Sequence, residues 1–141
     1  MTAKQYLEQL RVLDTKINQK LRELDNLIAV ATNTGAIDYS KDKVQTSSQN
    51  AQEEKICKYV DLDAEINREI DIYVNERHKI INQIHELKNV DYITLLYKRY
   101  VEYKSLEQIC VEMHFSYVYV RKMHGYALKN FEDKFLKDDT Q

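Results

Sequence analysis

The chain has 141 residues, of which 21 are Lys or Arg and 23 are Asp or Glu, so its formal net charge is −2. It contains no proline and only two glycines. This composition excludes strand-and-turn architectures, because such folds need these residues to punctuate the chain, and it predicts an all-α protein.

The first predicted helix begins at Thr2, which forms a capping box with Gln5. Behind this cap, apolar residues recur at alternating steps of four and three, interrupted only at Asp14, which is the spacing of a coiled-coil seam. The seam consists of Ala3, Leu7, Leu10, Ile17, Leu21, Leu24, Ile28 and Ala31. A helix on the order of 40 Å long with a single apolar stripe needs a partner helix to cover it.

A polar, aperiodic segment follows, and it predicts a mobile loop near 33–49. Asn50 and Glu53 then favour a new helix start, and a broad apolar stripe runs to about Lys88. The stripe consists of Ile56, Tyr59, Val60, Leu62, Ile66, Ile70, Tyr73, Val74, Ile80, Ile81, Ile84 and Leu87. This helix folds back on the first as an antiparallel hairpin or pairs with another subunit, since the seam does not distinguish the two arrangements.

Charged residues near the two seams have two interpretations. These residues are Asp14, Asp63 and Arg77, which either set the register of the paired helices or lie at the solvent-exposed edge of the seam.

Asn89-Val90-Asp91 predicts a break, with Asp91 as the N-cap of a support helix. The apolar face of that helix consists of Ile93, Leu96, Tyr97 and Tyr100. The expected organisation is a coiled module at 1–90, a small three-helix domain at 91–137 and an acidic tail at 138–141. A domain of about 45 residues is near the lower size limit for an independent core, so it is expected to lean on the coiled module.

The C-terminal part predicts two more helices joined by a tight turn. Ser105 and Gln108 form a second capping box, and Ser116 is the expected N-cap of the last helix. The apolar faces consist of Leu106, Ile109, Cys110 and Met113, and then of Val120, Met123, Ala127 and Leu128. The chain turns at His114 and Phe115, with Phe115 filling the corner, so the pair forms a helix-turn-helix. The same spacing also fits an ordinary helical hairpin.

Several landmarks in this part recur in a known family: Arg99-Tyr100, Ile109-Cys110, Ser116, Val120-Arg121 and Ala127-Leu128. With them the segment 92–131 resembles the sigma-factor domain that reads the upstream promoter element. Through Ser116-Tyr117 and His124-Gly125-Tyr126-Ala127-Leu128 it also resembles small regulators encoded by phages and prophages of Gram-positive bacteria. His114 departs from the pattern, because the family usually has a glycine of positive φ there.

The resemblance implies base contacts by the residues that follow Ser116: Tyr117, Val118, Arg121 and Lys122. In a major groove, Arg bridges two guanine acceptors and Val touches a thymine methyl group. Lys98, Lys104 and Lys129 are expected to contact phosphates, which fixes register without reading sequence.

Three further side chains keep alternative roles. Tyr117 and Tyr119 either donate a hydroxyl to phosphate or half-bury their rings against a neighbouring helix. Arg99 is expected to pair with Glu107 or Glu112, with a phosphate contact as the second choice.

Charge supports a local attraction to DNA. Residues 92–137 carry eight Lys and Arg against five Asp and Glu, whereas residues 1–91 carry thirteen against sixteen. So few cations bind DNA weakly, which favours a homo-oligomer through the long helices, RNA polymerase as a second anchor, or both.

The expected function is therefore a sequence-specific, double-stranded-DNA-binding transcriptional regulator of phage or prophage type. A helical adaptor that binds a partner such as RNA polymerase without reading DNA is the alternative, and the near-neutral overall charge favours it.

No enzyme is expected, and no catalytic, metal or cofactor site is predicted. His78 and His85 lie on a charged face, His114 and His124 belong to different helices, and the two cysteines lack ligand spacing. The sequence shows no apolar run of membrane-spanning length and no signal-peptide pattern, so the expected location is the cytoplasm of a bacterial host.

Overall fold

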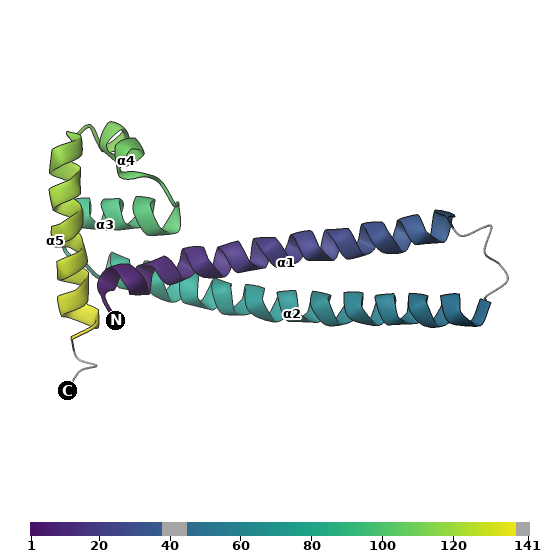
Figure 1. The fold of residues 1–141 in the computed structure, drawn as a ribbon. Coiled ribbons are helices and arrows are strands. Elements are labelled where there is room, and N and C mark those ends of the chain that lie inside the picture. The colour runs from purple at the N-terminus through teal and green to yellow at the C-terminus, as the bar shows by residue number, and fades with distance from the viewer. Residues whose placement is uncertain (38–44, 138–141) are drawn as a thin grey trace. The chain divides into compact units, whose positions relative to one another are not determined.

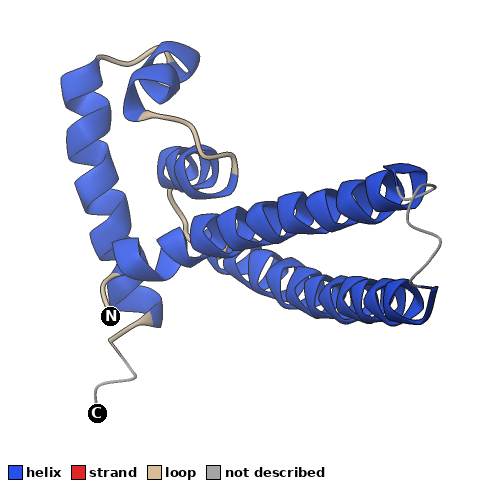
Figure 2. Cartoon of the chain, turned by 45° about the vertical axis from the view of Figure 1, so that its right-hand side comes forward, coloured by secondary structure: helices blue, strands red, loops and turns tan. Residues whose placement is uncertain are grey.

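The computed structural model describes residues 1–37 and 45–137, and it describes side chains for 1–30 and 51–137. Every regular element in these ranges is a helix, which confirms the predicted all-α fold (Figure 2). The elements are α1 (Ala3–Ile37), α2 (Gln45–His85), α3 (Val90–Leu96), the π-helix η3 (Tyr97–Val101), α4 (Leu106–Met113) and α5 (Tyr117–Phe135) (Figure 1). The predicted acidic tail lies outside the described residues.

The start of α1 is fixed by the predicted capping box. The Gln5 N–H donates to Thr2 Oγ1 at 3.2 Å, and the Thr2 N–H donates to Gln5 Oε1 at 3.1 Å. These two bonds satisfy amide groups that have no partner within the helix, so the helix begins where the sequence placed it.

The break between the long helices is shorter than the predicted loop near 33–49. The first helix continues to Ile37, and the second begins at Gln45 rather than at Asn50; residues 38–44 lie outside the described part. Ser, Thr and Asn each cost only roughly a few tenths of a kcal/mol in a helix, and extending a helix is far easier than nucleating one. Polar composition therefore marked the break but placed its ends too far apart.

The support helix begins two residues earlier than predicted. Asn89, not Asp91, is the N-cap of α3, and its Oδ1 accepts the N–H groups of Asp91 at 2.9 Å and Tyr92 at 3.4 Å. Asn and Asp are equally good N-caps, so local composition did not decide between them. Asp91 instead lies in the first turn, where its negative charge interacts favourably with the positive end of the helix dipole.

The chain contains two compact units, Met1–Leu13 with Tyr73–Gln141 and Asp14–Ile72. These units are contact groupings with divisions at residues 13/14 and 72/73, and the predicted domain boundary at residue 90 stays a prediction. Tertiary contacts determine this grouping, because the first three turns of α1 bury their apolar side chains among the C-terminal elements.

The larger unit has two neighbouring apolar clusters. The first draws on the start of α1, the end of α2, the end of α3, η3 and α5. Its buried members are Ala3, Leu7, Leu10, Ile80, Ile84, Leu87, Leu96, Tyr100, Val101, Ala127 and Phe131. The second joins α3, α4 and α5, and its buried members are Leu95, Ile109, Val120 and Met123. The C-terminal helices thus depend on residues of both long helices for their core, as their small size led us to expect.

The smaller unit is an antiparallel helical hairpin, in which α1 and α2 run side by side (Figures 1 and 2). Leu24, Leu62 and Ile66 form its buried cluster. On one flank, the Lys20 ammonium pairs with Glu65 at 2.7 Å and with Glu69. The hairpin thus has a narrow apolar core that an ion-pair network closes on one side.

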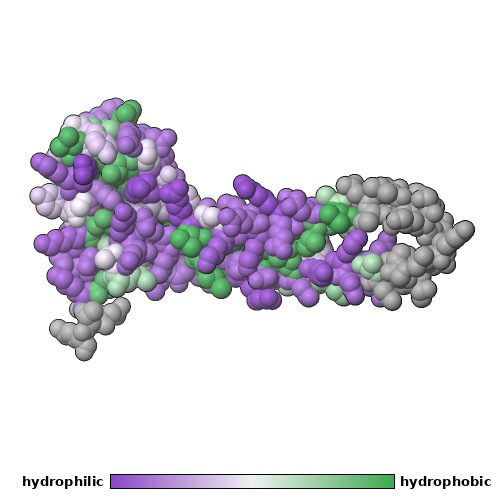
Figure 3. Space-filling view, in the orientation of Figure 1, coloured by the Kyte–Doolittle hydropathy of each residue, from purple (hydrophilic) through white to green (hydrophobic). Residues whose placement is uncertain are grey.

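Apolar side chains also lie on the outside of this hairpin. Those exposed by more than a third are Leu21, Ile28, Val30, Ile56, Tyr59, Val60 and Ile72. Figure 3 shows apolar patches among the hydrophilic surface of the long helices. Asp14 and Asp63 are partly exposed beside the core. Two helices alone therefore leave part of the predicted seam uncovered.

A π-helix and a left-handed residue separate α3 from α4. η3 continues directly from Leu96, and Tyr103 then adopts a φ of 59°, which is uncommon for a residue with a bulky side chain. The Tyr103 hydroxyl lies 3.2 Å from that of Tyr73. No local pattern predicted the π-helix, because the apolar spacing of this segment fits an ordinary α-helix equally well.

Candidate nucleic-acid interface

The candidate interface is built on α4, α5 and the three residues between them. Ser105 Oγ accepts the Gln108 N–H at 3.2 Å, and Gln108 Oε1 accepts the Ser105 N–H at 3.1 Å, which completes a capping box. Ser116 Oγ accepts the Tyr119 N–H at 3.2 Å. Both predicted caps are confirmed, so local side chains fix the starts of both helices.

The turn is left-handed at His114, whose φ is 60° and ψ is 37°. Glycine is the usual residue at such a C-cap, and a β-carbon there costs roughly 1–2 kcal/mol. The next residue, Phe115, is partly buried against the second apolar cluster, and its N–H donates to Cys110 O at 3.0 Å. Phe115 thus fills the corner of the turn as predicted.

One face of α5 is buried along its length. Its buried residues are Val120, Met123, Ala127 and Phe131. Val120 and Met123 pack with Leu95 of α3 and Ile109 of α4. This packing determines which side of α5 faces away from the core, and therefore which side chains a partner could reach.

The opposite face of α5 is exposed and carries most of the residues that the sequence assigned to DNA. Val118 is 61% exposed, and Arg121, Lys122 and Lys129 are exposed as well. Positions 118, 122, 125 and 129 follow one another at steps of four, three and four, so they lie in one line along the helix, with Arg121 at its border. We call Val118, Arg121, Lys122, Gly125 and Lys129 the outward stripe.

The residues at the start of α5 combine structural roles with exposure. Tyr117 is 41% exposed and Tyr119 is 49% exposed. The Tyr119 ring also lies 4.9 Å from that of Phe115, between ring centroids, so it helps to pack the turn. Ser116 serves as the N-cap, which uses an acceptor position of its hydroxyl and not its proton.

The lysines expected to contact phosphates are not equivalent. Lys104 Nζ lies 2.7 Å from Glu112 and 3.3 Å from Glu102, and Lys98 Nζ lies 3.3 Å from Glu112. The hydrogen bond with Glu112 is the main cause that raises the pKa of Lys104, and the same bond lowers the pKa of Glu112. Carboxylates therefore offset the charges of Lys98 and Lys104, and Lys129 is the phosphate-contact candidate that lies on the outward stripe.

Arg99 does not take either of its predicted partners. Its Nη1 donates to the main-chain oxygen of Lys104 at 3.0 Å, and Lys98 binds Glu112 instead. The difference arises because η3 widens the helical turn and the chain reverses at Tyr103, which brings the Lys104 carbonyl within reach. Arg99 thus fixes the approach to α4.

Two residues of α5 were not among the predicted contacts. Gly125 lies in the middle of the outward stripe, and Tyr126 beside it is 64% exposed. A glycine inside a helix costs roughly 0.5–1 kcal/mol relative to alanine. A glycine inside a predicted helix was therefore a signal that this position is special. Gly125 was considered only as part of the motif that carries the resemblance.

Comparison with known protein families places residues 33–132 in the family described as "Protein of unknown function (DUF1492)". The match covers more than half of the chain. The chain belongs to this family. The matched range contains α2, α3, η3 and α4 and extends into α5, so the outward stripe lies inside the DUF1492 region. No curated protein matches the chain, and no solved structure does.

A partly buried polar pair joins η3 to α5 in this DUF1492 chain. Tyr100 Oη and His124 Nε2 lie 2.8 Å apart, and the two rings are stacked with centroids 5.7 Å apart. Burial is the main cause that lowers the pKa of His124 to about 4, and the nearby cations of Arg99 and Lys4 add to it. Burial likewise raises the pKa of Tyr100 to about 12. The pair is therefore neutral near pH 7.

We expect this pair to make the DUF1492 chain less stable as pH falls from about 6.5 to about 4. In that window the unfolded chain binds a proton at His124 that the folded chain does not bind, because the folded pKa is about 4 and the ordinary value is 6.5. Chemical denaturation across this pH range measures the effect. His124→Gln removes the titrating group, so the variant should lose stability less steeply on acidification. Parallel curves for the two proteins would contradict the assignment.

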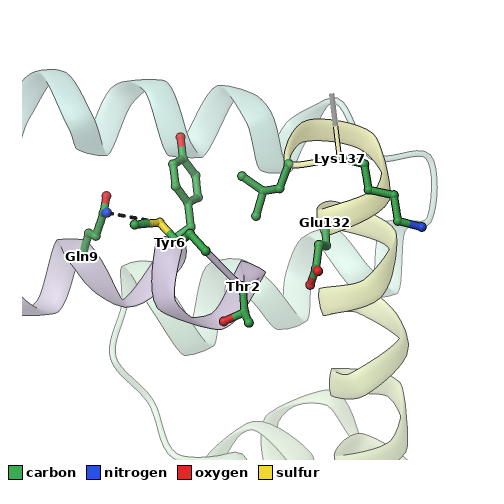
Figure 4. A pocket seen from close by; sticks show the side chains of 7 residues that line it. Thr2, Tyr6, Gln9, Glu132 and Lys137 are labelled. Atoms are coloured by element: carbon green, nitrogen blue, oxygen red, sulfur yellow. Dashed lines mark hydrogen bonds between the residues drawn. The ribbon is translucent and has the colours of Figure 1, made fainter. Parts of the chain in front are cut away.

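An open groove lies where the start of α1 meets the end of α5 (Figure 4). Its volume is about 730 Å³, and its lining residues are Met1, Thr2, Tyr6, Gln9, Glu132, Leu136 and Lys137. Glu132 Oε2 accepts the Ala3 N–H at 3.4 Å, and the Tyr6 hydroxyl donates to Gln83 Oε1 at 2.7 Å. These contacts tie the first turn of α1 to α5 and α2 in the DUF1492 chain.

The described ranges hold no group of three or more His, Cys, Asp or Glu side chains placed to bind a metal ion. Nor does any helix within them combine the length and the apolarity that crossing a membrane requires. Cys57 is exposed and Cys110 is partly exposed, and both are free thiols.

Proposed function

We propose that this DUF1492 chain is a sequence-specific DNA-binding regulator of transcription, of the type encoded by phages and prophages. The observation that carries the proposal is the capped pair of α4 and α5, in which α5 buries one face and exposes Val118, Arg121 and Lys122 on the other. An exposed first turn of the second helix is what a major groove accepts from a helix-turn-helix.

The chemistry of the outward stripe supports recognition of base edges. Arg121 supplies two parallel donors for the guanine acceptors, and Val118 supplies a methyl surface for thymine. The resemblance places Lys122 at a base edge, but Lys122 lies in line with Lys129 on the exposed face, and we propose that both supply positive charge for the flanking phosphates. The proposal therefore assigns base reading to the start of α5 and phosphate binding to the residues that follow along the same helix.

The hairpin Asp14–Ile72 is proposed to bind a second copy of the chain or RNA polymerase. Its support is the set of apolar side chains that two helices leave exposed, including Leu21, Ile28 and Ile56. Oligomerisation would present two copies of α5 to the two halves of a DNA site, which compensates for the few cations on each copy. A measurement of mass in solution tests whether the chain associates with itself.

Selection of bound sequences from random DNA duplexes tests the proposal directly. The wild-type chain should enrich one motif, and the double variant Arg121→Ala, Lys122→Ala should not. A matched control removes two exposed cations from the hairpin, Lys16→Ala with Arg22→Ala, and should enrich the wild-type motif. Enrichment by the α5 double variant equal to that of the wild type would rule out this reading edge.

A specific observation favours the adaptor function as the alternative. Val111 of α4 is 72% exposed beside Glu107. Glu112 forms ion pairs with Lys98 and Lys104. An apolar residue among acids suits a protein partner better than DNA. In this alternative, α4 and the long helices bind RNA polymerase and α5 reads no bases.

Salt dependence separates the two functions. Each phosphate contacted contributes a slope of about −0.9 to a plot of log binding constant against log salt concentration. Lys122 and Lys129 are the proposed phosphate contacts exposed on α5, so DNA binding by one copy should show a slope of up to about −2. Titration of the complex with potassium chloride measures this slope. If the binding constant for the chain's partner hardly changes with salt concentration, the adaptor function is favoured.

A further inference from the structure

Gly125 occupies an unusual place, because nothing in the chain itself requires a glycine there. It lies inside α5, and its φ is not positive. A β-carbon built at this position meets no atom within 4 Å, so neither backbone conformation nor close packing explains the missing side chain. The helix would gain stability from alanine at this position.

The surroundings of Gly125 indicate what could need the space. Lys122 precedes it by three residues and Lys129 follows it by four, and both share its line on the exposed face. Arg121 lies one turn before it on the border of the same stripe. Beyond Lys129 the positive charge of the helix ends, because Lys134 and Lys137 are balanced by Glu132 and Asp133. Positive charges therefore flank a position at which the helix backbone has no side chain over it. This arrangement suits an anionic surface that approaches the backbone closely.

The position along α5 fits the wall of a DNA groove. Gly125 is eight residues after Tyr117, which corresponds to about 12 Å of helix. The major groove is about 12 Å wide, so a helix that enters with its first turn meets the phosphate backbone about this far along. The outward stripe would then read bases at Val118 and Arg121 and lie against phosphates from Lys122 to Lys129.

We propose that Gly125 is a contact point for the DNA sugar-phosphate backbone, where the absence of a side chain lets the groove wall lie directly against α5. This inference rests on the proposed DNA-binding function and adds a positioning residue to it. Gly125 carries no sequence information, and it sets how deeply the start of α5 enters the groove, with Lys122 and Lys129 holding the phosphates on either side.

The test compares wild type with Gly125→Ala and Gly125→Leu on two short fluorescein-labelled duplexes, one enriched by selection on the wild-type chain and one of random sequence. Alanine should raise the melting temperature by roughly 2–4 °C, because it is the better helix former. It should nevertheless weaken binding about tenfold on both duplexes, and leucine should weaken it further, since phosphate contacts act on all sequences alike. Asn130→Ala, at an exposed position off the stripe, is the matched control and should leave affinity unchanged.

The outcomes distinguish the inference from the function on which it rests. Wild type that binds neither duplex overturns both. Wild type that binds while Gly125→Ala binds equally well or more tightly overturns only the role of Gly125. A variant that keeps its DNA affinity but changes the mass of the chain in solution would assign the gap to a protein partner and would also overturn the proposal.

Discussion

Replacing Phe131 by alanine should lower the free energy of unfolding of the larger unit by about 3–5 kcal/mol, the usual cost of deleting a buried aromatic ring. Phe131 is fully buried, and its ring lies 5.8 Å from that of Tyr6 and 4.9 Å from that of Phe135, between centroids. Urea denaturation followed by circular dichroism measures the loss.

The control for this prediction lies on the same helix. Tyr126 is 64% exposed, so Tyr126→Ala should change stability by less than about 0.5 kcal/mol. A loss below about 1 kcal/mol for Phe131→Ala would show that α5 does not depend on the start of α1. A large loss would show that α5 is anchored by the cluster in which Phe131 packs with residues of α1, α2 and η3.

Replacing Arg121 by alanine should weaken binding to the selected duplex by about 1–3 kcal/mol, which is roughly 5- to 150-fold. The expected cause is the loss of a bidentate contact with one guanine, so discrimination should relax at one base position and persist at the others. Arg121 is exposed on α5, so its removal should leave the fold intact. Binding to a set of single-base variants of the duplex measures both effects.

Two comparisons sharpen the interpretation of that result. Arg121→Lys keeps the charge but loses the planar fork, so it should recover overall affinity better than specificity. Arg11→Ala removes an exposed arginine of α1 and should have no effect on base preference. If Arg121→Ala lowers affinity equally for every duplex, Arg121 contacts phosphate and another residue reads the sequence.

The C-terminal helices illustrate how far local sequence determines structure. Ser105 with Gln108 and Ser116 placed the starts of α4 and α5 correctly, because a cap satisfies amides only three residues away. The apolar spacing likewise identified Ile109, Val120 and Met123, which are all buried. These are short-range relations, and a single sequence contains them in full.

Long-range relations were less accessible. The sequence paired Arg99 with a carboxylate, whereas Arg99 donates to the Lys104 carbonyl and Lys98 reaches Glu112. Both results depend on η3 and on the left-handed Tyr103, neither of which has a local signal. The ends of the predicted loop near 33–49 were displaced for a related reason, since polar residues add little cost to a helix that already exists.

The order of the amino acids alone determined which elements are helical, where three of them begin and which face of each is apolar, because these depend on spacings of a few residues. The tertiary structure decided that the first three turns of α1 share a core with α5, that Glu112 binds Lys98 and Lys104, and that Arg121 and Lys122 remain exposed. An apolar stripe specifies that a partner surface is needed, and only the packing of the whole unit specifies which surface it is.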